Sequence, residues 1–117
     1  RGHVYIAPGA QHMMVTGKGG HRIRLTADEP VNGHKPSVDV LFRSIAELVD
    51  GRMTGIILTG MGRDGAEGLL KMREAGAKTM AQDEATSLVY GMPRVAWEIG
   101  AAEKRVPIGG MAKAIFN

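Results

Sequence analysis

The segment from Gly55 to Gly65 constrains this chain more than any other part of the sequence. Its first five residues, GIILT, form the continuous apolar run expected of a strand that is buried on both faces. The turn GMGRDG follows at once, and a helix is expected from about Ala66 to Ala75. A strand that turns through glycines into a helix is typical of α/β proteins, in which ligands and catalytic groups collect at the carboxyl ends of strands.

The flanking segments predict further elements. Short β-prone runs occupy 4–7, 13–16 and 21–26, and the last two are expected to form a hairpin with one solvated face. A helix is expected to begin at Ser37 as N-cap, with Asp39 in its first turn, and to end at Gly51. A strand over 78–81, a helix from Pro93, and an extended piece and a last helix between 106 and 116 follow.

This order predicts the α/β class: part of a doubly wound, mostly parallel sheet flanked by helices, with an antiparallel hairpin near the N-terminus. Only about two buried parallel strands are evident in the pattern, although such a sheet needs more strands and cover on both faces. The chain therefore resembles half of a domain.

Composition excludes several classes of function. The chain has no cysteine, which excludes disulfides and thiolate metal sites and fits a reducing cytoplasm. No apolar run approaches the roughly 18 residues of a membrane span. The net charge of +3 is dispersed and aromatic residues make up only 4%, so nucleic-acid binding is weakly supported. The four histidines lack metal-ligand spacing, and no metal is expected.

Asp64, within the glycine turn, allows three interpretations. It could cap the helix that follows, with Glu67 as the partner in a capping box. The turn also matches the dinucleotide-binding pattern G-x-G-x-x-G, with Asp83 and Glu84 where a ribose-binding acid belongs, but a carboxylate disfavours a pyrophosphate. Thirdly, Asp64 could orient a histidine in a Ser-His-Asp triad. The pattern alone does not separate the first interpretation from the third.

A resemblance to a known family favours the third interpretation. Six blocks carry it, in order and in spacing: VYIAPG at 4–9, HKPSVDVLF at 34–42, ILTGMGRDGA at 57–66, MR at 72–73, AQDEA at 81–85 and YGMP at 90–93. Together they are similar to the catalytic domain of the chemotaxis protein-glutamate methylesterases (CheB type). The resemblance runs from end to end and identifies residues 1–117 as the C-terminal portion of that domain.

The resemblance implies an activity and a set of partners. These cytoplasmic carboxylic ester hydrolases remove γ-methyl esters from glutamates in the cytoplasmic region of chemoreceptors, and many also deamidate receptor glutamines. A response-regulator domain often precedes the catalytic domain. In the family's T-G-M-G-x-D-G turn the aspartate is the triad acid, which is Asp64 here, and the methionine lines the active site, which is Met61. No metal or organic cofactor is implied.

Two members of the expected triad are absent from this chain. The family's serine lies in a G-x-S-x-G-like turn and its histidine in a Q-H-M-P segment, and neither motif is present. Gln11-His12-Met13 imitates the second motif but lacks the proline and matches a non-catalytic position. Ser37, Ser44 and Ser87 stand in no nucleophile turn.

We therefore expect the chain by itself to be inactive. A Rossmann-like dinucleotide-binding fragment and a non-catalytic interaction domain are the alternatives to an esterase fragment.

Overall fold

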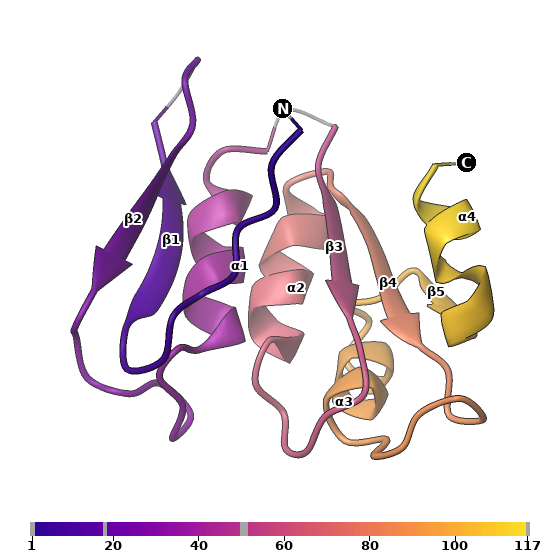
Figure 1. The fold of residues 1–117 in the computed structure, drawn as a ribbon. Coiled ribbons are helices and arrows are strands. Elements are labelled where there is room, and N and C mark those ends of the chain that lie inside the picture. Colours follow the sequence, from indigo (N-terminus) through magenta and orange to yellow (C-terminus); the bar gives the residue numbers. More distant parts are fainter. Residues whose placement is uncertain (1, 18, 50–51, 117) are drawn as a thin grey trace.

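The computed structural model describes residues 2–17, 19–49 and 52–116, and its centre is a three-stranded parallel sheet (Figure 1). The strands are β3 (Thr54–Ile57), β4 (Lys78–Gln82) and β5 (Lys104–Val106), in the order β3-β4-β5. Helix α2 (Ala66–Glu74) connects β3 to β4, and α3 (Met92–Glu98) connects β4 to β5. The predicted α/β class and its parallel crossovers are confirmed.

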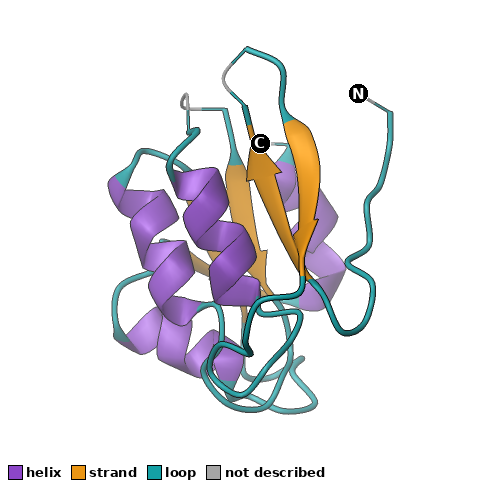
Figure 2. Ribbon diagram, turned by 90° about the vertical axis from the view of Figure 1, so that its left-hand side faces the viewer, coloured by secondary structure: helices purple, strands orange, loops and turns teal. Residues whose placement is uncertain are grey.

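Helices α1 (Val38–Ala46) and α2 lie side by side, and α2 and α3 pack against β3 and β4. Figure 2 shows these three helices on one side of the strands and the N-terminal segment on the other. The core between helices and strands is mostly aliphatic, as expected for a chain with few aromatics. It is built from Phe42, Ile57, Ala66, Leu69, Met72, Ala77, Ala81, Ala96, Ala101 and Ala102.

The predicted hairpin is present as β1 (His12–Thr16) and β2 (Arg22–Thr26), paired antiparallel with Met14 opposite Arg24. It packs against α1 through β1, where the Val15 N–H donates to the Ser44 hydroxyl at 3.0 Å. The expectation of one solvated face is incomplete, because β2 is exposed along nearly its whole length on both faces.

Three local predictions differ from the structure. Residues 4–7 form no strand, and Val4 and Ile6 are 88% and 87% exposed, because no strand in the described part of the chain pairs with them. The run around β3 is buried on one face only: Gly55 and Ile57 are buried, whereas Leu58 is 43% exposed. Helix α1 ends at Ala46, and Gly51, the predicted end, lies outside the described residues.

The C-terminal part follows β5 and returns to β4. A 3-10 turn, η1 (Ile108–Gly110), leads into the short helix α4 (Met111–Ile115). The Lys78 ammonium of β4 donates to the Ala114 carbonyl at 2.6 Å and ties this helix to the sheet. Within the described ranges, no helix has the length and apolar character needed to cross a membrane.

Candidate active site

Asp64 is a buried carboxylate at the carboxyl end of β3, with 3% of its surface exposed. Its Oδ1 accepts hydrogen bonds from the Ser37 hydroxyl at 2.8 Å, from the Asn32 side-chain amide at 2.9 Å and from the Asp39 N–H at 3.3 Å. Its Oδ2 accepts the Val38 N–H at 2.6 Å. The two backbone donors are the first N–H groups of α1, so Asp64 caps a helix that precedes it by 26 residues.

This environment keeps Asp64 ionised. Burial by itself raises the pKa of a carboxyl, but the hydrogen bonds from Asn32, Ser37 and the backbone N–H groups of Val38 and Asp39 outweigh it and lower the pKa of Asp64 below 3.8. The positive end of the α1 dipole acts in the same direction. The site is therefore a fixed negative charge at the end of a strand.

The lowered pKa of Asp64 predicts a pH dependence of stability. A carboxyl whose pKa is lower in the folded than in the unfolded state contributes stability that is present above pH 3.8 and is lost as the pH falls through the folded value. We expect the free energy of unfolding to fall on acidification, and to fall less steeply in Asp64→Asn. Urea unfolding between pH 7 and 3 measures both slopes, and equal slopes would contradict the prediction.

Asp39 performs the corresponding task for α2. It lies in the first turn of α1, is 1% exposed, and its Oδ1 accepts the Gly68 N–H from the first turn of α2 at 2.7 Å. Asp64, just before α2, caps α1, and Asp39, within α1, caps α2. We call this arrangement the reciprocal cap. It fixes the two helix N-termini side by side near the carboxyl end of β3.

The predicted capping box is not formed. The N-cap of α2 is Gly65, whose positive φ of 94° suits glycine and which has no side chain that could cap its own helix. Glu67 instead makes exposed ion pairs with Arg43 at 3.0 Å and Arg63 at 3.7 Å. Ser37 is the N-cap of α1 as predicted, but its hydroxyl donates to Asp64 and does not cap its own helix.

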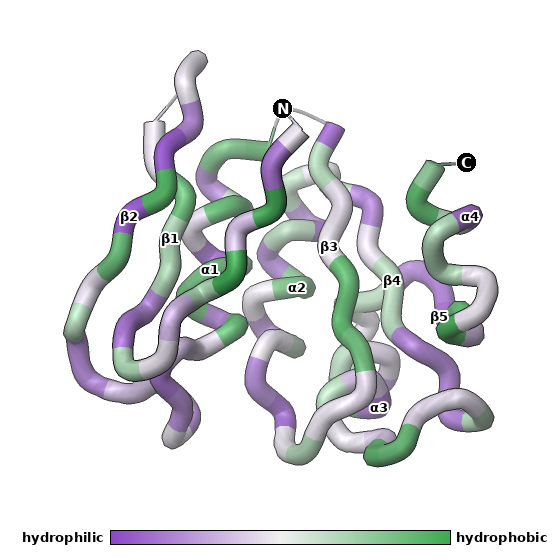
Figure 3. Tube along the Cα trace, in the orientation of Figure 1, coloured by the Kyte–Doolittle hydropathy of each residue, from purple (hydrophilic) through white to green (hydrophobic). Residues whose placement is uncertain are grey.

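Met61 lies in the same loop as Asp64 but its side chain is 79% exposed. The backbone at this point is held by the neighbouring loop, because the Gly60 N–H donates to the Val89 carbonyl at 3.0 Å. Leu58, Leu88 and Val89 are also exposed, in this loop and in the neighbouring loop to which Gly60 is bonded. Figure 3 shows apolar residues along β3 and its end. Met61 is therefore one of several exposed apolar residues in the two loops that follow β3 and β4.

The sequence around His12 resembles the family's histidine motif, but the hydrogen bonds of His12 give it a structural role. Its Nδ1 accepts the Ser37 N–H at 3.1 Å, and its Nε2 bonds the Glu29 carbonyl at 2.9 Å, which requires the neutral Nε2–H tautomer. The ring is 1% exposed and contacts the Ser37 backbone, while the Ser37 hydroxyl bonds Asp64 directly. The hydroxyls of Ser44 and Ser87 donate to backbone carbonyls.

Replacing His12 by Phe is expected to destabilise the chain by about 2 kcal/mol, because it leaves the buried Ser37 N–H without an acceptor. Urea unfolding measures the loss. In a longer product that contains the whole catalytic domain, the same variant should keep most of its kcat. A loss of several orders of magnitude would contradict the structural role of His12.

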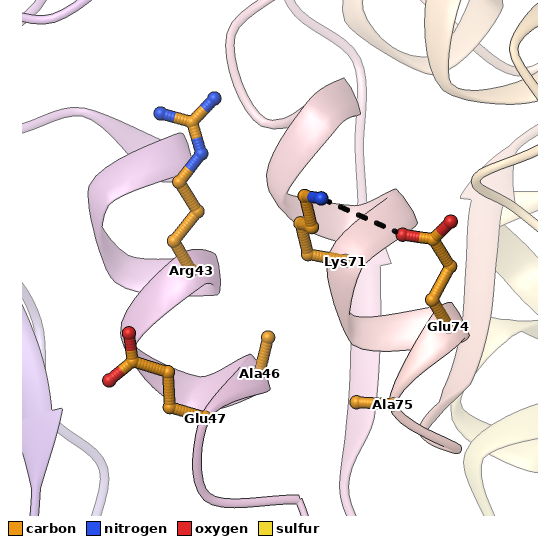
Figure 4. Close-up of a pocket in the computed structure, with 6 residues that line it drawn as sticks. All are labelled: Arg43, Ala46, Glu47, Lys71, Glu74 and Ala75. Carbon is orange, nitrogen blue, oxygen red and sulfur yellow. Dashed lines mark ion pairs between the residues drawn. The ribbon is translucent and has the colours of Figure 1, made fainter.

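One hollow lies away from Asp64, at the other ends of α1 and α2 (Figure 4). Its volume is about 460 Å³, and it is lined by Arg43, Ala46, Glu47, Lys71, Glu74 and Ala75. The charged side chains are of both signs, and Lys71 pairs with Glu74 at 3.9 Å. Nothing in this lining resembles a nucleophile with its base, so we do not assign the site here.

The dinucleotide interpretation finds little support in the geometry. The Asp39 carboxylate binds the Gly68 N–H at the N-terminus of α2, where a pyrophosphate would lie. Asp83 binds the N–H and the hydroxyl of Thr86 within its own turn. Among the described residues, no three His, Asp or Glu side chains gather as metal ligands.

The fold and the site define a class: an α/β domain with an ionised carboxylate at the carboxyl end of a parallel strand, the edge at which such domains place functional groups. The family model described as CheB methylesterase matches residues 1–115. The chain belongs to the CheB methylesterase family.

Individual relatives agree with this assignment. Protein-glutamate methylesterase/protein-glutamine glutaminase 1 of Caulobacter vibrioides is 58% identical over 99% of this chain and 34% of its own length. The Agrobacterium fabrum protein-glutamate methylesterase/protein-glutamine glutaminase is 54% identical over 99% of this chain and 33% of its own length. The chain thus spans about a third of the curated relatives it matches.

The solved structures confirm the fold. The crystal structure of the Thermotoga maritima CheB methylesterase catalytic domain superposes with a TM-score of 0.90 and 32% sequence identity. The match covers 95% of this chain and 59% of that one.

The sequence did not predict that Asn32 and Asp39 belong to the site. The sequence indicates Asp39 only as an acidic residue in the first turn of a helix. Both belong to the stretch that precedes and opens α1, and its proximity to Asp64 depends on tertiary packing.

Proposed function

We propose that the protein to which this chain belongs is a protein-glutamate methylesterase that acts on the methylated cytoplasmic region of chemoreceptors. Asp64 serves as the acid of a Ser-His-Asp triad. The serine and histidine come from a part of the protein outside this chain, so the chain alone does not catalyse. The observation that carries the proposal is the buried, ionised Asp64 at the end of β3, in a member of the CheB methylesterase family.

The chemistry follows from the role of a fixed negative charge. The serine hydroxyl attacks the carbonyl carbon of the γ-methyl ester while the histidine accepts its proton. Asp64 accepts a hydrogen bond from the Nδ1–H of that histidine, sets its tautomer and stabilises the imidazolium. The histidine returns the proton to the methoxide, methanol leaves, and water hydrolyses the acyl-enzyme to glutamate. These steps need only side chains and water.

A carboxylate that caps a helix is suited to this role. Its four hydrogen bonds hold it in one orientation and keep it charged when the imidazolium forms. We also assign Met61 to the lining of the active site, and its exposed side chain in the loop that carries Asp64 supports this assignment. Attack on a receptor glutamine would form the same acyl-enzyme with loss of ammonia, which is the glutaminase activity in the names of the relatives.

Two further proposals concern the whole protein. We infer a cytoplasmic location, where the methylated receptor region lies, and a response-regulator domain ahead of the catalytic domain. Methanol release from a methylated receptor by the longer gene product tests the function. A product that binds NAD(P) in calorimetry and releases no methanol would overturn it in favour of the dinucleotide interpretation.

A further inference from the structure

A single side-chain amide bridges the two carboxylates of the reciprocal cap. Asn32 Nδ2 donates to Asp64 Oδ1 at 2.9 Å and to Asp39 Oδ2 at 2.7 Å. An amide nitrogen carries two N–H bonds, so each is used by one carboxylate. The flipped amide would set its oxygen against both negative charges, and the orientation of Asn32 is therefore determined by its partners.

The backbone at Asn32 has a separate explanation. Asn32 and Gly33 both have positive φ, 54° and 76°, and form the centre of a type I′ turn closed by the two hydrogen bonds between Val31 and His34, at 3.0 and 2.9 Å. Such turns favour Asn-Gly. The turn accounts for the choice of residues along the backbone, but it does not account for an amide placed between two buried carboxylates.

The acceptor positions of Asp64 are unevenly used. A carboxylate oxygen has two lone pairs, and Oδ1 already receives the donors of Asn32, Ser37 and Asp39. Oδ2 receives the Val38 N–H alone among the contacts of the described residues, which leaves one acceptor direction on that oxygen. A histidine Nδ1–H that binds Asp64 would therefore donate to Oδ2.

We propose that Asn32 is a positioning residue for ester hydrolysis. Its amide binds Asp64 Oδ1 and Asp39 Oδ2 at the same time and so fixes the Asp64 carboxylate, with Oδ2 directed to the triad histidine. The inference rests on the proposed role of Asp64. Without the amide, the two carboxylates repel each other and Asp64 loses a charge-assisted hydrogen bond. The histidine then loses its fixed orientation. Because Asn32 acts through Asp64 and does not touch the substrate, kcat falls while KM is retained.

Two variants in the full-length gene product test the proposal, with methanol release from a methyl-labelled receptor as the assay. Asn32→Gly keeps the type I′ turn and removes the amide, and should lower kcat about tenfold with an unchanged KM. Asn32→Asp is nearly isosteric and sets a third carboxylate beside the other two, and should lower kcat further. Gly33→Ala is the matched control, because it strains the same turn at φ 76° and leaves the amide in place.

The Asp64→Asn background decides how Asn32 acts. There, Asn32→Gly should change kcat less than about twofold, because the group it positions is already gone. An equal loss in both backgrounds, a kcat of Asn32→Gly close to the unmodified protein, or a loss in Gly33→Ala as large as in Asn32→Gly would overturn the inference. If instead Asp64→Asn itself keeps full activity, the proposed function fails and the inference fails with it. Circular dichroism confirms that each variant is folded.

Discussion

Asp64→Asn in the full-length gene product is expected to lower kcat for methanol release by about 10⁴ with little change in KM. Asparagine has the shape of aspartate but no negative charge, and its amide nitrogen cannot accept the N–H of a histidine. The histidine then adopts the wrong tautomer, and the imidazolium that forms during the attack has no counter-charge. The loss falls on the transition state, which is why kcat carries it.

Asp83→Asn is the matched control for this experiment. Asp83 also follows a parallel strand, β4, but its carboxylate accepts hydrogen bonds from the N–H and hydroxyl of Thr86 in its own turn and caps no neighbouring helix among the described residues. Its replacement should leave kcat nearly unchanged. If Asp64→Asn behaves like Asp83→Asn in the assay but still loses stability in urea, Asp64 is a capping residue only.

The elements of this fold could be predicted where local pattern and burial agree. The strands β3 and β4 and the helices α1 to α3 follow from apolar spacing, from Pro93 and from the glycines that separate them. Residues 4–7 have the same β-prone composition but form no strand. Strand formation requires hydrogen bonds to a neighbour, and composition does not say whether a neighbour is present.

The candidate site was harder to predict than the strands and helices, because its contacts join distant parts of the chain. That Asp64 follows a strand could be read from the sequence, but the helix that it caps could not. Local spacing predicts that an acid just before a helix caps that helix, whereas the side chain of Asp64 points to α1. Asn32 is the extreme case, because Asn-Gly indicates only a turn, and its two carboxylate partners are 7 and 32 residues away.

The close approach of α1 and α2 allows a second test with a large expected effect, at Gly68. A Cβ added to Gly68 would lie 2.8 Å from the Phe42 Cβ and 3.2 Å from the Asp39 Cα, near enough to backbone that the helices must separate. The Gly68 N–H donates to Asp39 Oδ1, so separation also breaks the reciprocal cap. Gly68→Val should therefore lower the free energy of unfolding by about 3 kcal/mol.

The most informative result is whether the smaller substitution, Gly68→Ala, raises or lowers the free energy of unfolding. Helix propensity alone favours alanine over glycine by about 1 kcal/mol, so a helix with room for the methyl group would gain stability. We expect a net loss instead, because the steric cost at Phe42 exceeds that gain. Urea unfolding followed by the fluorescence of the single tryptophan, Trp97, measures it. Gly109→Ala is the matched control, since its Cβ meets no atom within 4 Å and it should change stability little. A more stable Gly68→Ala would mean that α1 and α2 tolerate separation and that the reciprocal cap does not hold Asp64 rigidly.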